Sequence, residues 1–229
     1  MIRASLVAAV VAVSLLAGCG GGGTDGGTAT LWVTRDEGRT MLLTRTVPAH
    51  ESVLQALERS AKVSTRYGGH FVQAIDGLSG SIGSRHDWFY FVNGVEGDRG
   101  AADYRLRDGD VVWWDYRDWG RYGQRVPAVV GAFPEPFVHG YDGKVRMTIV
   151  LGPATPVVRR IARLVHAKTI APEATTRVTG DINTLTIRPG GATSFTADWA
   201  DDAVHVVYTG DPARLLRDPS LYRHRYRLP

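Results

Sequence analysis

The residues best suited to chemistry are the aromatic side chains gathered in one stretch, from Asp87 to Trp119. Trp and Tyr combine a large apolar ring with a polar tip, so several together can stack on a flat amphipathic molecule. The expected chemistry is therefore noncovalent binding. The candidate ligand-binding residues, including one from a preceding loop, are Tyr67, Trp88, Tyr90, Trp114, Tyr116 and Trp119.

The second chemical group is the thiol of Cys19, the single cysteine of the 229-residue chain. A positively charged start and the apolar run from Leu6 to Leu16 have the form of an export signal, too short to span about 30 Å of hydrocarbon. The sequence Leu16-Ala17-Gly18-Cys19 then matches the bacterial lipobox, in which the cysteine receives diacylglycerol. We expect residues 1–18 to be a lipoprotein signal peptide, with an ordinary secretory signal as the alternative.

Reactive arrangements of other kinds are missing from the sequence. There is no Gly-x-Ser-x-Gly and no His-Glu-x-x-His, and the one thiol is assigned to lipid. His70 and His86 lack the spacing of a metal site, and the acidic residues after Glu96 lack the pattern of a calcium loop. We therefore expect no catalytic residues, no metal and no cofactor.

The charge of the chain indicates which partners it would meet. The formal net charge is +4, spread over scattered Arg residues, which argues against a nucleic-acid partner. The basic end, LYRHRYRLP, could instead contact anionic lipid or cell-wall polymer.

Two strands are expected to position the aromatic residues. Trp88 to Val92 and Val111 to Tyr116 have the length and aromatic content of β-strands, and Asn93-Gly94 and Asp108-Gly109-Asp110 supply turns. Successive side chains point to opposite faces, and both faces are apolar. The second face must therefore be covered by another part of the chain, a partner or a ligand.

The elements before these strands follow a simple order. Ala29 to Thr34 and Met41 to Val47 are expected to form a hairpin, and an apolar stripe predicts a helix over Glu51 to Ala61. Phe71 to Ile75 is expected to be a short strand. A hairpin, a helix and further strands in this order are typical of a β-grasp fold.

Three motifs resemble a known family. W-x-Y-F-V-N-G at Trp88 to Gly94, G-A-x-x-Y-x-L at Gly100 to Leu106 and D-G-D-x-V-x-W-x-Y at Asp108 to Tyr116 are similar to the transcobalamin C-terminal-like domain. This β-grasp domain occurs in bacterial surface lipoproteins and is similar to the smaller domain of vertebrate cobalamin carriers. The resemblance covers residues 29–119 and implies a corrinoid as the first candidate ligand.

The remaining chain is expected to hold a linker and a second domain. Residues 19–28 are a Gly-rich tether, residues 120–143 a Pro and Gly linker, and residues 144–229 a small α+β or α/β domain of unknown function. The fold class is thus α+β, with a β-grasp-like first domain. In the second domain we expect a Thr155-capped helix over Pro156 to Ala167, a second helix over 212–217, and strands over 145–151, 183–187, 193–199 and 204–208.

Two functions are consistent with these features. The first is a lipoprotein on the extracytoplasmic face of the bacterial membrane that captures a corrinoid or another flat amphipathic molecule for an importer. The cobalamin carriers close their site with a large helical domain that this chain lacks, so the second domain would have to form the other wall. The second function is a surface interaction module that binds protein or glycan, with the aromatic face as an interface.

Overall fold

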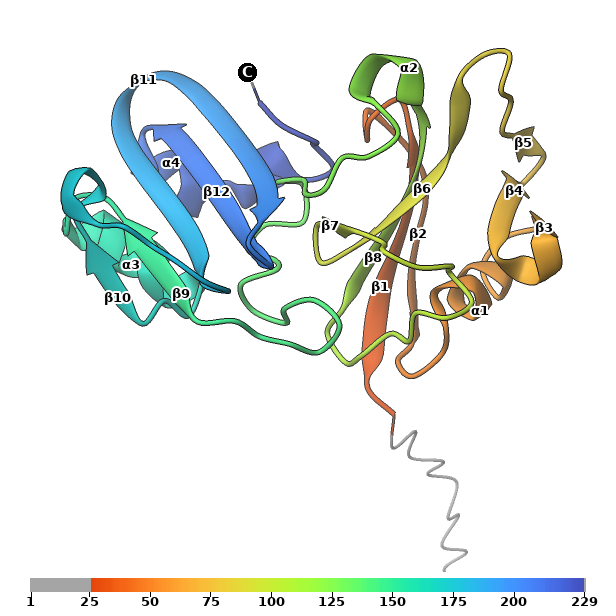
Figure 1. The fold of residues 1–229 in the computed structure, drawn as a ribbon, viewed down its shortest axis with the longest axis horizontal. Coiled ribbons are helices and arrows are strands. Elements are labelled where there is room, and N and C mark those ends of the chain that lie inside the picture. Colours follow the sequence, from red (N-terminus) through yellow and green to blue (C-terminus); the bar gives the residue numbers. More distant parts are fainter. Residues whose placement is uncertain (1–25, 229) are drawn as a thin grey trace, which may run out of the picture.

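A computed structural model describes residues 26–228, so the predicted signal peptide and Cys19 lie outside the described residues. The chain forms three sheets joined by short helices, mostly β with a mixed α+β character. Two lobes lie side by side, and the chain enters the first of them through β1 (Figure 1). Within residues 26–228, no helix has the length and apolar content needed to cross a membrane.

The first lobe is built on a five-stranded sheet. The two central strands are parallel, although the other neighbours pair antiparallel, and the expected hairpin joins the first two strands. In spatial order the sheet consists of β2 (Thr40–Pro48), β1 (Thr28–Arg35), β8 (Val111–Asp118), β6 (His86–Val92) and β7 (Val95–Glu96).

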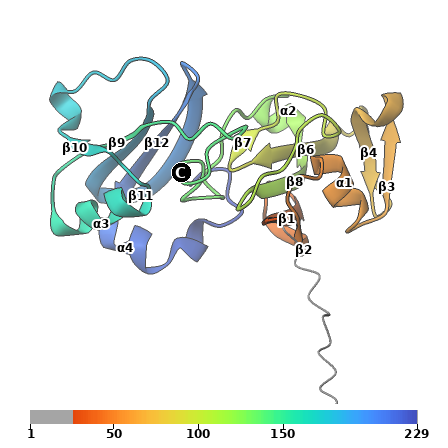
Figure 2. The ribbon, with the colours of Figure 1, turned by 90° about the horizontal axis from the view of Figure 1, so that it is seen from below.

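One helix and a small sheet cover one face of that large sheet. Helix α1 (Val53–Glu58) lies between the large sheet and a three-stranded sheet (Figure 2). It is shorter than the predicted Glu51 to Ala61, because the chain must leave it to enter β3. The three-stranded sheet consists of β3 (Val63–Arg66), β4 (Phe71–Ile75) and β5 (Leu78–Ser79).

The start of α1 has reciprocal caps. The amide of Gln55 donates to the Ser52 hydroxyl at 3.1 Å, and the Ser52 amide donates to the Gln55 side chain at 2.9 Å. Such a pair satisfies two amides that no helical carbonyl reaches. The short helix is therefore stabilised at its start and by its buried Val53 and Leu57.

The two faces of the large sheet belong to different hydrophobic clusters. Leu31, Val112 and Trp114 face α1 and share its core, whereas Trp32 and Trp113 pack on the other side. That other side is covered by Val129, Ala132 and Tyr226. The chain itself therefore covers the second apolar face, by way of a segment after β8 and the C-terminal segment.

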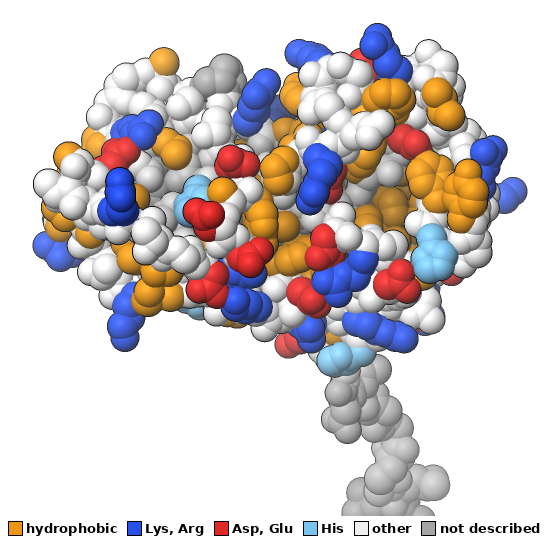
Figure 3. Space-filling view, viewed as in Figure 1, with side chains coloured by type: hydrophobic (Ala, Val, Ile, Leu, Met, Phe, Trp, Pro, Cys, Tyr) orange, Lys and Arg blue, Asp and Glu red, His pale blue; other side chains and the backbone are white. Residues whose placement is uncertain are grey.

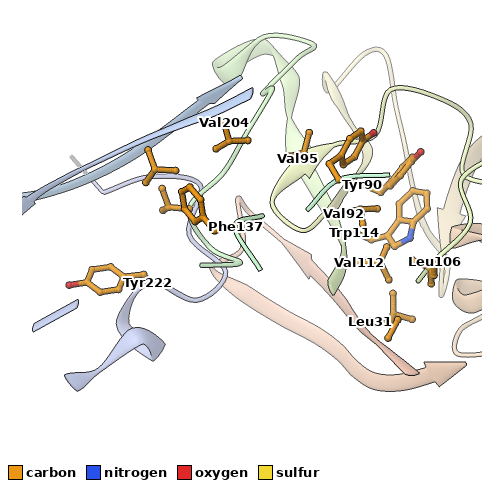
Figure 4. Packing of buried hydrophobic residues seen from close by; sticks show 14 of the residues in the cluster. Leu31, Tyr90, Val92, Val95, Leu106, Val112, Trp114, Phe137, Val204 and Tyr222 are labelled. Atoms are coloured by element: carbon orange, nitrogen blue, oxygen red, sulfur yellow. The ribbon is translucent and has the colours of Figure 1, made fainter. Parts of the chain in front are cut away.

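Residues 120–143, expected as a linker, are largely packed. They begin within α2 (Trp119–Tyr122) and bury Val130 and Phe137. The ring of Phe133 lies 5.5 Å from that of Phe195 in the second lobe. The Phe and Pro side chains of this segment thus stand between the two lobes, where one cluster of buried residues runs from Trp114 past Phe137 to Tyr222 (Figure 4).

The second lobe contains a four-stranded sheet and two helices. Strand β11 bends at Pro189 to Gly191, so that its two halves both pair with Tyr208 of β12. The sequence predicted these two halves as separate strands. Helix α3 has the predicted Thr155 cap but ends three residues earlier. The elements are β9 (Thr148–Leu151), α3 (Pro156–Leu164), β10 (Thr169–Ala171), β11 (Asn183–Ala200), β12 (Ala203–Gly210) and α4 (Pro212–Arg217), and the sheet order is β10-β9-β11-β12.

A buried carboxylate attaches the C-terminal segment to the first lobe. Asp115 is fully buried and accepts hydrogen bonds from Thr34 Oγ1 at 2.5 Å, Gly38 N at 3.1 Å and the Tyr226 hydroxyl at 2.8 Å. Burial raises the pKa of Asp115 from 3.8 to about 6, although these three donors oppose the shift. Leu228 then pairs with Phe195, so the same segment also joins the second lobe.

Replacing Asp115 by Asn should reduce the pH dependence of stability. The pKa of Asp115 is higher in the folded chain than in the unfolded chain, so its contribution to stability is complete below pH 4 and is lost as the pH rises through 6. The loss should amount to about 2 to 3 kcal/mol. Urea unfolding from pH 4.5 to 7.5 should therefore show a smaller fall in the free energy of unfolding for Asp115→Asn than for the natural chain. Equal pH profiles would contradict this, and Asp202→Asn, at an exposed position, is the matched control.

Candidate functional site

The clearest hollow beside the predicted aromatic residues is a groove of about 440 Å³ in the first lobe. It lies between β6 and β8 on one side and β4 on the other, and the loop after β7 borders it. Hydrophobic side chains lie in the hollow and charged side chains surround it (Figure 3). No residue after Arg125 lines it, so the second lobe does not supply the wall that the sequence analysis expected.

Three of the six predicted ligand-binding residues line this groove. The rings of Tyr90 and Trp114 are 5.2 Å apart, and Trp88 lies beside them on the same face of the sheet. All three are largely buried, with 2% to 8% of their surface exposed. A ligand would therefore meet ring edges at the bottom of a groove rather than an open aromatic platform.

The indole N–H groups of Trp88 and Trp114 differ in whether they have a hydrogen-bond acceptor. Trp88 Nε1 donates to the Leu78 carbonyl at 2.8 Å, whereas the buried Trp114 Nε1 has no acceptor in the described chain. Trp113, on the other face, donates to Thr34 Oγ1 at 2.7 Å. An unpaired buried donor costs about 1 to 3 kcal/mol, and this one lies out of reach of a ligand in the groove because the Nε1 atom has almost no exposed surface.

Charged groups stand at the edge of the groove. The bidentate pair of Arg99 with Asp98 lowers the pKa of that carboxyl, and burial raises the pKa of Glu96 against the opposing charge of Arg117. Arg125 is 76% exposed and its Nε is 3.9 Å from Glu96, which leaves it free to contact a ligand. Among residues 26–228, no group of three or more His, Cys, Asp or Glu side chains could hold a metal ion.

The other three predicted residues lie outside the groove. Tyr116 contacts Trp88 with ring centres 5.2 Å apart and donates its hydroxyl to the Ser79 carbonyl. Trp119 begins α2. Tyr67 is 78% exposed and, with Ile82, borders a separate hollow that shares the Phe71 side chain with the groove.

Sequence reasoning missed the groove residues contributed by other elements. Phe71 was assigned to a strand but not to the site, and neither Arg99 nor Arg125 was considered. The sequence carried one signal that Phe71 could belong to the site, because it is an aromatic residue that begins a strand next to a Gly-Gly turn. The two Arg residues carry no local signal, since the folded chain alone brings them to the groove.

The polar residues of the recognised motifs hold the sheet together. The Asn93 amide donates to Asp110 Oδ1 and to the Gly140 carbonyl, both at 2.7 Å, and Asn93 Oδ1 accepts from the Val111 amide at 2.8 Å. Asn93 has a φ of 51° in the turn after β6, a backbone shape that Asn tolerates well. Asp108 accepts from the Thr28 amide at the start of β1. These residues thus form the scaffold beside the groove and do not line it.

A comparison with protein families finds a match over part of the chain. Residues 50–118 match a family described as a domain of unknown function, DUF4430. No curated protein matches the chain in sequence.

Two solved structures share a limited similarity with the first lobe. Haptocorrin in complex with Cbi is 20% identical, with a TM-score of 0.32 over 40% of this chain and 25% of that one, so the similarity spans a quarter of haptocorrin. A Ruminococcus gnavus protein described provisionally as metal binding is 15% identical, with a TM-score of 0.34 over 40% of this chain and 97% of its own.

The role of Asn93 as scaffold predicts a large loss of stability when its side chain is removed. Asn93→Gly keeps the positive φ accessible but leaves Asp110 Oδ1 and the Gly140 carbonyl without their donor, so the free energy of unfolding should fall by about 2 to 3 kcal/mol. Asn93→Ala adds backbone strain of about 1 kcal/mol. Urea denaturation of both variants tests this, and a loss below 0.5 kcal/mol in both would show that the network contributes little.

Proposed function

We propose that this protein is a lipoprotein on the extracytoplasmic face of the membrane that binds a small molecule in the groove of its first lobe. The observation that carries this proposal is the groove itself, which Trp88, Tyr90 and Trp114 line together with Arg99 and Arg125. The aromatic side chains supply apolar contact, and the guanidinium groups can donate hydrogen bonds to a polar group of a ligand.

The groove suits a planar group of limited size. At about 30 Å³ for each water-sized unit, 440 Å³ has room for on the order of 15 non-hydrogen atoms. A corrinoid is several times larger, so it would place only one edge in the groove. Its remaining surface would lie across the mouth, beside Arg99 and Arg125.

The order of the elements supports a β-grasp-like first domain, because a hairpin is followed by α1 and then by further strands. This is the fold that the resemblance to the transcobalamin C-terminal-like domain implies. That resemblance makes a corrinoid the first ligand to test. A lipid-anchored binder without catalytic groups would pass its ligand to an importer, which is the partner we propose.

A second candidate function is a surface interaction module. Tyr67 and Ile82 are 78% and 87% exposed, and both border the hollow next to the groove. Exposed large apolar side chains in one area are typical of a surface that binds protein or glycan. Under this function the aromatic side chains that line the groove would serve only as part of the hydrophobic core.

Titration with cobinamide and cobalamin separates the two functions. The chain from Thr24 onward keeps every described contact, and we expect it to bind one of them with a micromolar or lower Kd by calorimetry. Trp114→Phe puts a smaller ring at the groove, so the affinity should fall a few-fold through lost contact area. Phe71→Ala should weaken binding through lost contact area.

The matched control is Trp199→Phe in the second lobe, which should leave the affinity unchanged. Urea denaturation of each variant separates loss of binding from loss of fold. Absence of binding to either corrinoid, or equal affinity in all variants, would contradict the corrinoid proposal and favour the interaction module.

The anchor is tested at Cys19 in the intact chain. Cys19→Ser should abolish incorporation of labelled palmitate and move the protein out of the membrane fraction, because only the thiol accepts the diacylglycerol. Thr24→Ala, close to Cys19 in sequence, is the matched control and should stay in the membrane fraction with its label. Unchanged fractionation and labelling of Cys19→Ser would refute the lipid anchor.

A further inference from the structure

A second pocket lies where the C-terminal segment crosses the first lobe. It has a volume of about 110 Å³, and its walls come from the turn after β1, from α2 and from the C-terminal segment. At about 30 Å³ for each water-sized unit, this is room for three or four such units, close to the size of one phosphate group. None of its residues lines the groove of the first lobe.

Positive charge gathers around this pocket. Three guanidinium groups line it, from Arg39, Arg225 and Arg227, against the single carboxylate of Glu37. That carboxylate is already paired with Arg39. Arg225 and Arg227 have no carboxylate partner in residues 26–228, so two like charges face one pocket without a counter-charge.

The ring of Tyr122, which lines the pocket, contacts a further cation, Arg121. The guanidinium of Arg227 is 5.6 Å from the centre of this ring, and that of Arg121 is 5.3 Å from it. Cation contacts with one aromatic ring hold both side chains near the pocket. Their mutual repulsion would be relieved by an anion between them.

The positive charge of this region also acts on a neighbouring histidine, His224. Burial lowers the pKa of His224 to about 4, and the charges of Arg223 and Arg225 act in the same direction. The backbone of this segment is fixed, because the His224 amide donates to the Gly131 carbonyl and Tyr226 is buried. The Arg side chains therefore stand on a rigid support and are not part of a free tail.

We propose that this pocket is an anion site that binds a single phosphate group, held by Arg225 and Arg227 with Arg39 at its edge. A guanidinium presents its N–H groups as a planar fork that matches two phosphate oxygens, and several such forks around a small pocket favour a compact multivalent anion. The site is independent of the ligand groove, so either proposal stands if the other fails.

The pocket lies at the opposite end of the first lobe from the start of β1. The chain enters β1 at one end, and the pocket lies beyond the other end, where α2 and the C-terminal segment meet (Figure 1). Eight residues of β1 separate the two ends by about 25 Å. The phosphate group could belong to a soluble or wall-borne molecule or to a lipid headgroup, and the experiments below separate these sources.

Calorimetry with inorganic phosphate tests this on the chain from Thr24 onward, at low ionic strength in chloride buffer. We expect saturable binding at one site, weakened about tenfold by Arg225→Gln and by Arg227→Gln. Both side chains are exposed, so the variants should keep the fold, which circular dichroism checks. The matched control is Arg159→Gln on the exposed side of α3, which should bind phosphate as the natural chain does.

Phosphatidylglycerol vesicles are the second arm. Vesicle binding that inorganic phosphate displaces would support the site and identify a lipid headgroup as one source, whereas phosphate binding without vesicle binding would support a soluble or wall-borne source. Vesicle binding with no saturable phosphate binding would overturn the proposal, since it would show a diffuse basic surface. Equal phosphate affinity in Arg225→Gln, Arg227→Gln and Arg159→Gln would overturn it as well.

Discussion

The structure depends on one constraint, which is that both faces of the sheet formed by β1, β8 and β6 are apolar. A sheet of this kind is stable in water only when two layers cover it. Helix α1 and the small sheet cover one face, and a segment from Val126 to Ala132 with the C-terminal Tyr226 covers the other. The second layer comes from the far end of the chain, so the two lobes are joined through the core of the first.

Covering the second face also buries charge. Asp115 and Arg117 point from β8 into this layer and are fully buried. Asp115 binds Tyr226, and Arg117 binds Glu96 and stacks on Phe89 at 3.9 Å. Buried charges of this kind contribute little net stability but strongly penalise alternative packings. We infer that they determine how the C-terminal segment crosses the sheet.

Helix α1, on the first face, has only six residues. The groove lies on this side of the sheet, between β6 and β8 and the layer formed by β4 and the loop after β7, and Trp88, Tyr90 and Trp114 line it. A short helix on a sheet of large aromatic residues is thus accompanied by both a well-packed core and an opening beside it. Trp114 Nε1 is buried in this core without an acceptor in the described chain.

Local patterns in the sequence determined β1, β2, β4, β6 and β8 of the first lobe, its hairpin and the capped start of α3, because side-chain alternation and capping act over a few residues. They also placed Trp88, Tyr90 and Trp114 on one face. The short strands β3, β5 and β7 were not predicted. The sequence Ser-Val-Leu-Gln at Ser52 carried the cap of α1 as well, a signal that was overlooked. Only the tertiary structure decided that the segment after β8 and the C-terminal segment cover the opposite face, that Phe71 and Arg125 join the groove, and that Arg39 meets Arg225. Contacts between residues far apart in sequence depend on how layers pack, and no local pattern encodes that packing.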